Sequence, residues 1–409
     1  MATMTRHQLA SAAALSAALV LAACGAQDET DPAADSVAEP EDGRTDVNEP
    51  QTRLVVTTEG GASVLDAGSG EVLGTFSTRA RPVAVVAGDG RHVLLVQADA
   101  DLTEILDAGT WASGHGDHHH YYVREPMLRD VRVEGGSPVH VVSHDGQTAI
   151  FHDDDGTATV FSDDGLLIDS LDTTIVDSGA PHHGVVVPQG AWAVVSIPPP
   201  PGDDTLPIGM SLVDEDGSEF VRFDDCPGLH GEAALGDVLA FACADGVLLV
   251  DGQDAQKVPY PSDDGRIGSF TAGPADEYLV GNYTATSLLA VDVDDAHAHE
   301  IELDAPYAAR ALDEHGDLVA LTTDGTLHVV DVADAAIESS VPGVLPAFDI
   351  PEDWQEPRPT LTVVGHTAYV ADPATMTVLA VDLTSGTAVD TFAVDGVPTA
   401  IVAVPTPSH

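Results

Sequence analysis

Three short motifs of the sequence place a histidine at the same point of a repeating pattern. In each, a proline or glycine comes just before the histidine and a short apolar strand follows. The motifs are Pro138-Val139-His140-Val141, Pro181-His182-His183-Gly184 and Gly228-Leu229-His230-Gly231. Neutral imidazole nitrogens are preferred ligands of Zn²⁺, at about 2.0–2.1 Å in a tetrahedral shell. We therefore expect His140, His183 and His230 to bind one zinc ion. His182 and Glu232 are additional candidates, and Glu232 would serve as a ligand or as a hydrogen-bond acceptor for an imidazole.

A histidine-rich insert within residues 111–130 precedes the first of these motifs. It reads Gly114-His115-Gly116-Asp117-His118-His119-His120-Tyr121-Tyr122. Three imidazoles leave the fourth position of a tetrahedral zinc ion open. We expect the insert to fold over the other histidines and to supply this ligand from His118 or His120, with Asp117 and His115 as further candidates. The alternative is a solvated loop of low metal affinity.

Other polar clusters have a simpler interpretation. His144, His152, His315 and His366 fall in or beside predicted hairpin turns, where solvated positions are expected. The run Asp153-Asp154-Asp155-Gly156 lacks the regular spacing and the closing Glu of a calcium loop, so it is also interpreted as a hairpin turn.

These residues need a scaffold that brings them together, and the sequence indicates a β-propeller. From Thr52 onward, short Val, Leu, Ala and Ile runs alternate with Asp-Gly turns, which is typical of antiparallel strands. The pattern repeats at the period of a propeller blade, about 40–50 residues. Blades are predicted to start near Pro82, Pro138, Pro181, Gly228, Gly268, Ala308, Pro359 and Val397.

Eight blades are therefore expected, with seven as the alternative. The C-terminal strand would complete the blade of Arg53–Phe76 and close the ring, which removes the exposed edge of the sheet. The first strand of each blade lines the channel, so histidines of three consecutive blades would converge at one mouth.

The N-terminal segment predicts export and anchoring. An apolar stretch after Arg6 ends in Leu21-Ala22-Ala23-Cys24, a pattern similar to a bacterial lipobox. We expect residues 1–23 to be a lipoprotein signal peptide, Cys24 to carry the lipid, residues 24–51 to be a disordered acidic tether and residues 52–405 to form the propeller. The protein would then lie outside the cytoplasm, at the outer face of the cytoplasmic membrane.

Cys226 and Cys243 remain as a disulfide pair, with a metal site as the lesser alternative.

Composition excludes one class of partner. The chain has 409 residues, and 14 Lys and Arg against 68 Asp and Glu give a formal charge of -54. Nucleic-acid binding requires clustered cations, so it is not expected. The sequence contains no G-x-S-x-G, H-E-x-x-H or P-loop motif, and we expect no enzymatic activity. A zinc-dependent hydrolase and a non-catalytic interaction scaffold are the alternatives.

Four motifs, HGDHHHYYV, PVHVVSHDG, APHHGVVVP and CPGLHGEA, resemble the zinc metallochaperones of the AztD type. The resemblance extends over nearly the whole domain from Thr52. It implies a β-propeller of the cell envelope that passes zinc to the solute-binding protein of a zinc ABC importer. It also implies that His140, His183, His230 and histidines of the insert belong to the zinc site.

Overall fold

The computed structural model describes residues 43–115, 118–168, 170–202, 206–272, 278–353 and 355–406. All of them belong to one compact unit, Glu39–His409. The predicted signal peptide, Cys24 and Asp117 lie outside the described residues, as do the side chains of His115 and His118. Within the described ranges, no helix is long and apolar enough to cross a membrane.

The unit is built from eight four-stranded antiparallel sheets, which are the blades of a propeller. From the inner to the outer strand, the first four blades are β35 (Pro398–Val404), β2 (Arg53–Thr58), β3 (Gly61–Asp66), β4 (Val72–Ser77); β5 (Val83–Val86), β6 (His92–Gln97), β7 (Leu102–Asp107), β10 (Met127–Glu134); β11 (Pro138–His144), β12 (Gln147–His152), β13 (Thr157–Ser162), β14 (Thr173–Asp177); and β15 (Val186–Gln189), β16 (Trp192–Ile197), β17 (Gly209–Val213), β18 (Glu219–Phe223).

The other four blades follow in chain order. They are β19 (Glu232–Leu235), β20 (Val238–Cys243), β21 (Gly246–Asp251), β22 (Asp254–Pro259); β23 (Phe270–Ala272), β24 (Tyr278–Asn282), β25 (Ser287–Asp292), β26 (His297–Glu302); β27 (Tyr307–Leu312), β28 (Leu318–Thr322), β29 (Leu327–Asp331), β30 (Ala336–Val341); and β31 (Thr360–Val364), β32 (Thr367–Asp372), β33 (Thr377–Asp382), β34 (Thr387–Ala393). A four-residue helix α1 (Asp164–Leu167) and the 3-10 turn η1 (Ala98–Ala100) are the described helical elements.

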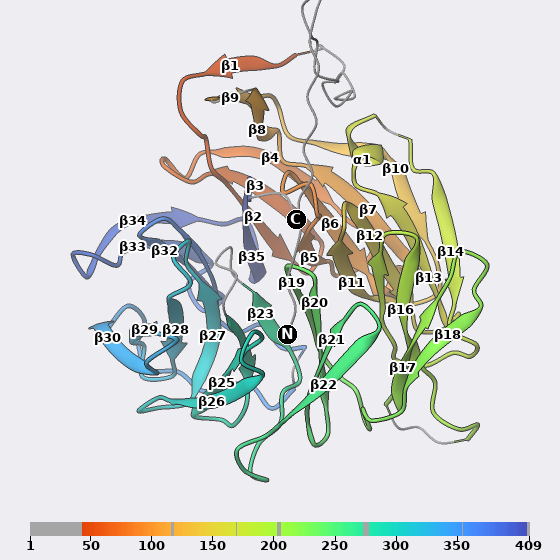
Figure 1. The fold of residues 1–409 in the computed structure, drawn as a ribbon. Coiled ribbons are helices and arrows are strands. Elements are labelled where there is room, and N and C mark those ends of the chain that lie inside the picture. The colour runs from red at the N-terminus through yellow and green to blue at the C-terminus, as the bar shows by residue number, and fades with distance from the viewer. Residues whose placement is uncertain are drawn as a thin grey trace, which may run out of the picture. The chain divides into compact units, whose positions relative to one another are not determined.

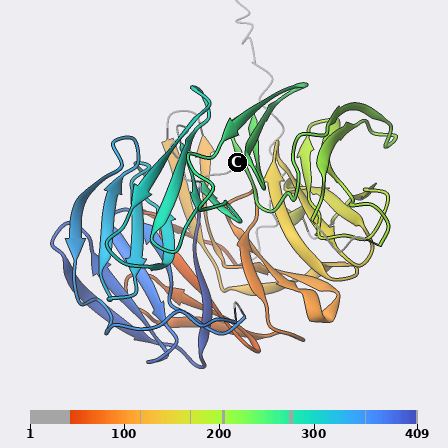
Figure 2. The same cartoon turned by 90° about the horizontal axis from the view of Figure 1, so that it is seen from below.

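The blades form a closed ring with the inner strands around its centre (Figures 1 and 2). Eight apolar clusters fill the spaces between neighbouring blades, one at each interface of the described structure. Middle strands such as β6 and β20 are buried on both faces, which explains their continuous apolar runs. Outer strands such as β34 are mostly exposed.

The two ends of the domain close the ring as predicted. β2 pairs with β35 along its length, from Arg53↔Val404 to Thr58↔Pro398. β35 also contacts β5 and β31, the inner strands of the two neighbouring blades. The prediction of eight blades with closure between N- and C-terminal strands is therefore confirmed.

Each blade has two ends, which we call the proximal and distal faces of the ring. Inner strands begin at the proximal face, as β11 does at Pro138, and end at the distal face, as β11 does at His144. Most predicted blade starts agree with the observed inner strands to within two residues. In blades 4 and 5, however, regular pairing begins later, at Val186 and Glu232. His183 and His230 therefore lie in the segments that lead into the inner strands.

The histidine-rich insert forms a hairpin at the distal face, where the sequence had indicated the proximal one. Its strands β8 (Thr110–His115) and β9 (His118–Val123) interrupt blade 2 between β7 and β10. The hairpin leaves β7 after Asp107, which pairs with the first residue of β6 and the first residue of β10. A third strand, β1 (Thr45–Val47), pairs with β9. These three residues belong to the segment expected to be a disordered tether.

Two turn histidines are buried, contrary to the expected solvated positions. His144 at the end of β11 is 7% exposed, and its ring nitrogens lie 2.8 Å from the Pro188 carbonyl oxygen and 3.1 Å from that of Gly236. His152 is 2% exposed and its Nε2 lies 2.9 Å from Thr159 Oγ1. Blades 4 and 5 cover His144, and the linker residue Gly135 packs against the ring of His152. The sequence of a single hairpin does not reveal these contacts.

Candidate metal centre

Three imidazoles from three consecutive blades converge at the proximal face. The ring centroids of His140 and His183 are 4.7 Å apart, those of His183 and His230 are 5.2 Å apart, and those of His140 and His230 are 6.2 Å apart. Three imidazoles bound to one tetrahedral ion would have centroids about 5 Å apart, given Zn–N distances of about 2.0–2.1 Å. The predicted convergence of these residues is thus seen in the structure.

Each of the three rings has an outward partner at Nδ1. Nδ1 of His140 lies 2.8 Å from Glu232 Oε1, and Nδ1 of His183 lies 2.6 Å from Asp153 Oδ2. Nδ1 of His230 lies 2.8 Å from the carbonyl oxygen of Gly268. Because carboxylate and carbonyl oxygens accept hydrogen bonds, each Nδ1 carries the proton and donates it. This tautomer leaves the Nε2 lone pair of every ring available for a metal, as in carboxylate–histidine–zinc triads.

Two of these Nε2 atoms face each other directly. Nε2 of His140 and Nε2 of His183 are 3.1 Å apart. With both Nδ1 atoms already protonated, two lone pairs would meet unless a proton or a cation lies between them. Two nitrogens bound to one tetrahedral zinc ion would be about 3.3 Å apart, so the two rings need to move apart by only a few tenths of an ångström to hold the ion. Among the described residues, no group of three or more His, Cys, Asp or Glu side chains is placed so that it could hold a metal ion without such a movement.

The electrostatics of the cluster differ from ring to ring. Burial disfavours a charged His140, but the Glu232 carboxylate outweighs this effect and raises the pKa of His140. Burial lowers the pKa of His230, and the neighbouring imidazoles and Arg266 lower it further. Although burial opposes ionisation of Glu232, His140 holds the pKa of this carboxyl below its ordinary value. Glu232 therefore stays ionised and keeps the His140 ring in place.

A glycine lets His230 and Glu232 serve the same cluster. Gly231 between them has φ +106°, a conformation that favours glycine. A Cβ at this position would lie 2.9 Å from the carbonyl group of Gly268, the same group that accepts from His230. The chain can thus turn between the imidazole and the carboxylate without displacing the carbonyl.

His182, the neighbour of His183, is turned away from the cluster. Its Nδ1 lies 2.8 Å from the Ala180 carbonyl oxygen and its Nε2 lies 2.8 Å from Ser196 Oγ. Its ring also makes an edge contact with Phe151. Both nitrogens are therefore occupied within blades 3 and 4, and the structure does not bring His182 into the candidate site.

The insert is also remote from the three histidines. It starts at the distal end of β7, a strand whose six residues span about 17 Å. The ring of Trp111 at its base lies 3.7 Å from the guanidinium of Arg91, which also belongs to the distal face. His120 lies three residues before Val123 on β9, toward the tip of the hairpin, and its ring stacks on that of Tyr122. The expectation that His118 or His120 reaches the mouth of the channel is therefore not supported by the position of the hairpin.

Asp153 is the residue of the cluster that sequence reasoning missed. It was interpreted as part of a hairpin turn, and it does follow β12 in the turn before β13. That turn lies at the proximal face, next to the segment that carries His183. One oxygen of Asp153 and one of Glu232, Oδ1 and Oε2, are buried without a hydrogen-bond partner in the structure. Both oxygens are thus available to a cation or a water molecule.

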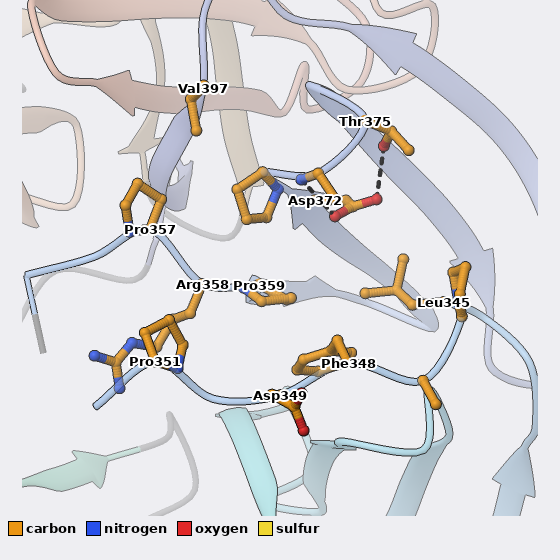
Figure 3. Close-up of a pocket in the computed structure, with 14 residues that line it drawn as sticks. Leu345, Phe348, Asp349, Pro351, Pro357, Arg358, Pro359, Asp372, Thr375 and Val397 are labelled. Atoms are coloured by element: carbon orange, nitrogen blue, oxygen red, sulfur yellow. Dashed lines mark hydrogen bonds between the residues drawn. The ribbon is translucent and has the colours of Figure 1, made fainter. Parts of the chain in front are cut away.

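A separate hollow of about 460 Å³ lies on the proximal face between blades 7, 8 and 1 (Figure 3). Its lining is largely apolar and rich in proline, with Leu345, Phe348 and Val397 among its residues. The carboxylate of Asp372 within it accepts hydrogen bonds from the Ala374 amide and from Thr375. The hollow contains none of the three histidines, so it is no substrate pocket for a zinc ion bound to them.

Replacing Glu232 by glutamine is expected to weaken zinc binding about 10–100-fold, the usual effect of losing such a hydrogen-bonded carboxylate. The amide keeps the shape of the side chain but removes the charge that orients His140. Zinc affinity would be measured by competition with a chromophoric chelator. Glu219→Gln is the matched control, because Glu219 pairs with Arg222 on the surface. Equal affinities of the two variants would contradict a role for Glu232.

The predicted disulfide is present between Cys226 and Cys243. Cys226 lies four residues before His230, and the amide of Ala244 donates to the Pro227 carbonyl at 2.7 Å. The bond therefore ties the segment of His230 to the proximal end of blade 5.

A Cys226→Ala, Cys243→Ala variant is expected to lose about 3 kcal/mol of unfolding free energy, since the bond closes a loop with a sequence separation of 17. Zinc affinity should fall as well, because the segment of His230 becomes less constrained. Chemical denaturation and chelator competition would measure the two effects. A reductant should weaken the parent and leave the variant unchanged; an identical response of both would argue against this role.

The fold and the site together define an eight-bladed propeller that presents three oriented imidazoles at one face. No protein-family model matches the sequence. The chain is 30% identical over 351 residues to the zinc chaperone AztD of Citrobacter koseri, covering 84% of this chain and 83% of that protein. The chain belongs to the AztD zinc chaperone family, as its motifs suggested.

Solved structures agree with this assignment. The crystal structure of Citrobacter koseri AztD matches with a TM-score of 0.83 and 29% identity, covering 87% of this chain and 98% of that one. The structure of apo AztD from the same organism matches with a TM-score of 0.79 and 28% identity over the same shares. The dihydro-heme d1 dehydrogenase NirN, at 13% identity and a TM-score of 0.57, covers 90% of this chain and 82% of its own, and shares the fold alone.

Proposed function

We propose that the protein is a zinc chaperone that binds one zinc ion through His140, His183 and His230 and delivers it to the solute-binding protein of a zinc ABC importer. The observation that carries this proposal is the pair of Nε2 atoms 3.1 Å apart, each on a ring whose Nδ1 is bound to a carboxylate. Membership of the AztD family supports zinc as the metal.

Different residues of the site would orient the zinc ligands and leave a position open for transfer. Asp153, Glu232 and the Gly268 carbonyl orient the three rings, so that the ligands need little rearrangement on binding. Three imidazoles leave one position of a tetrahedral ion open toward the proximal face. A ligand of the acceptor protein can enter there and displace the imidazoles in turn, so that zinc does not pass through solution. In this mechanism the distal hairpin takes no part in closing the site.

A lipid anchor at Cys24 would keep the chaperone where the importer works. The lipobox pattern Leu21-Ala22-Ala23-Cys24 supports this placement at the outer face of the cytoplasmic membrane. The acidic residues between Cys24 and β1 would then separate the propeller from the membrane surface. Metabolic labelling with a fatty-acid analogue, compared between the parent and Cys24→Ala, tests the anchor.

Direct transfer is the test of the chaperone function. Zinc-loaded protein would be mixed with the zinc-free solute-binding protein of the importer in the presence of a chelator that captures free zinc. We expect the acceptor to receive zinc despite the chelator, whereas zinc supplied as a salt should go to the chelator. Interception of all zinc by the chelator in both cases would refute direct delivery. A parallel screen for ester and lactone hydrolysis, with and without zinc, tests the hydrolase alternative.

A further inference from the structure

Arg310 is a cation without a carboxylate partner in a strongly acidic chain. It lies on β27, the inner strand of blade 7, and its Nη2 donates to the carbonyl oxygen of Ser269 at 2.8 Å and to Ser269 Oγ at 3.0 Å. Its Nε is buried without a hydrogen-bond partner. Among the described residues, no carboxylate forms an ion pair with Arg310. Half-buried charges are normally paired. Nη2 is used by Ser269 and Nε is buried, so Nη1, which makes no hydrogen bond within the described structure, is the group left to donate to a ligand.

Arg266, whose side chain is exposed, is a second cation without a carboxylate partner in the described structure. It precedes β23, and its Nη2 donates to the carbonyl oxygen of Gly228 at 2.5 Å. Within the part of the chain that the structure describes, Arg266 also has no ion pair. Its charge reaches His230, since it contributes to the lowered pKa of that imidazole after burial and the two other histidines.

Both arginines are held beside His230 by backbone groups. Arg266 binds Gly228, two residues before His230, and Arg310 binds Ser269, the residue after the Gly268 carbonyl that accepts from His230. The amides of Gly268 and Ser269 in turn donate to Asn282 Oδ1 at 2.9 and 2.8 Å. This network fixes the two guanidinium groups at the proximal face.

Most other cations of the described structure are neutralised by a carboxylate. The pairs are Arg81–Glu59, Arg91–Asp107, Arg124–Asp107, Arg129–Asp107, Arg132–Glu134, Arg222–Glu219 and Lys257–Asp245. The remaining described cations without an ion pair make no hydrogen bond to the segments that carry the three histidines. The surroundings of the cluster are therefore asymmetric. Asp153 and Glu232 accept hydrogen bonds from His183 and His140, whereas Arg266 and Arg310 bind the backbone segments that carry and contact His230.

We propose that Arg266 and Arg310 form a carboxylate-binding subsite next to His230. Guanidinium groups bind carboxylates through charge-assisted and often bidentate hydrogen bonds. A carboxylate oxygen is also an accepted zinc ligand. Each of the protein's own carboxylates at the cluster uses one oxygen to hold His140 or His183, and neither holds His230. A carboxylate held here, from a small molecule or from an acidic side chain of the acceptor, lies at the open side of the site. This role in zinc exchange rests on the proposed function, whereas carboxylate binding itself does not.

Calorimetric titration of the zinc-free protein at about pH 8, where imidazoles are neutral, tests the subsite. Citrate represents a free carboxylate ligand, and a capped oligoglutamate peptide represents acidic side chains of a protein. We expect at least one probe to bind the parent, and Arg310→Gln and Arg266→Gln each to weaken binding about tenfold. Binding of citrate alone assigns a small-molecule ligand, and binding of the peptide assigns a protein partner.

Control variants make the outcome specific. Arg222→Gln removes a surface arginine that is already paired and should leave binding unchanged, and Arg310→Lys should keep part of the affinity because it keeps the charge. Zinc content is measured on every variant. Failure of both probes to bind the parent, or equal binding by the Gln variants, would overturn the subsite. If the parent protein binds citrate but does not bind zinc, the proposed function is refuted and the subsite is not.

Discussion

Purified protein in which His140, His183 and His230 are all replaced by alanine is expected to contain no stoichiometric zinc, whereas the parent contains about one ion per chain. The three Nε2 lone pairs point inward because each Nδ1 is bound outward, so the variant loses every imidazole of the site. Carboxylates of Asp153 and Glu232 would remain, but borderline-soft zinc is held poorly by two carboxylates alone. Metal content would be measured by mass spectrometry after zinc loading and dialysis.

Two further variants decide between sites. Alanine in place of His118, His119 and His120 should leave the zinc content unchanged, because the hairpin that carries them extends from the distal face. Alanine in place of His315 and His366, two histidines remote from the candidate site, controls for lost surface imidazoles. Equal zinc in the parent and in the variant of His140, His183 and His230 would place the metal elsewhere. Loss of zinc in the hairpin variant would restore the original expectation for the insert.

Replacing Asp107 by asparagine is expected to cost about 3–5 kcal/mol of unfolding free energy, the usual effect of removing one partner from a buried ion pair. Asp107 is fully buried, and its carboxylate receives Arg91 Nη2 at 2.8 Å, Arg129 Nη1 at 3.4 Å and Arg124. Burial opposes ionisation of Asp107, but Arg91 and the other cations hold the pKa of its carboxyl far below the ordinary value. Without this charge, Arg91, Arg124 and Arg129 would each lose their ion pair with Asp107.

Denaturant unfolding of Asp107→Asn would measure the loss, with Glu134→Gln as the matched control. Glu134 also pairs with an arginine, at 2.9 Å from Arg132, but both side chains are exposed. The control should lose less than about 1 kcal/mol. The hairpin should loosen as well, because Asp107 Oδ1 also accepts from the amide of Gly109 at its base. Equal losses in the two variants would contradict a central role of this buried cluster.

Several features of the fold were predictable because they repeat. The alternation of apolar runs and Asp-Gly turns indicated four-stranded blades, and the short last strand without followers indicated closure with β2. The disulfide Cys226–Cys243 was predictable because these two cysteines remain once Cys24 is assigned to the lipid. The shared position of His140, His183 and His230 also depended only on the repeat, since equivalent residues of consecutive blades are neighbours around the ring.

The course of long insertions was not predictable in the same way. A segment between two strands can leave a blade at either face, and the choice depends on whether the insertion follows the third or the fourth strand. The sequence around residues 111–130 was taken as a loop before the blade of Pro138, whereas the structure places it between β7 and β10. Because β10 pairs with β7 across the insert, the insert leaves the blade after its third strand, at the distal face.

The sequence by itself determined the periodic features of this protein: the all-β class, eight repeats, the family and three equivalent histidines. Only the tertiary structure decided which groups from other blades meet those histidines. Asp153 reaches His183 from a turn of the preceding blade, the Gly268 carbonyl reaches His230 from the following blade, and Arg310 contacts Ser269 across a blade boundary. Periodicity records the period of one blade, whereas contacts between blades depend on side-chain direction and packing around the ring.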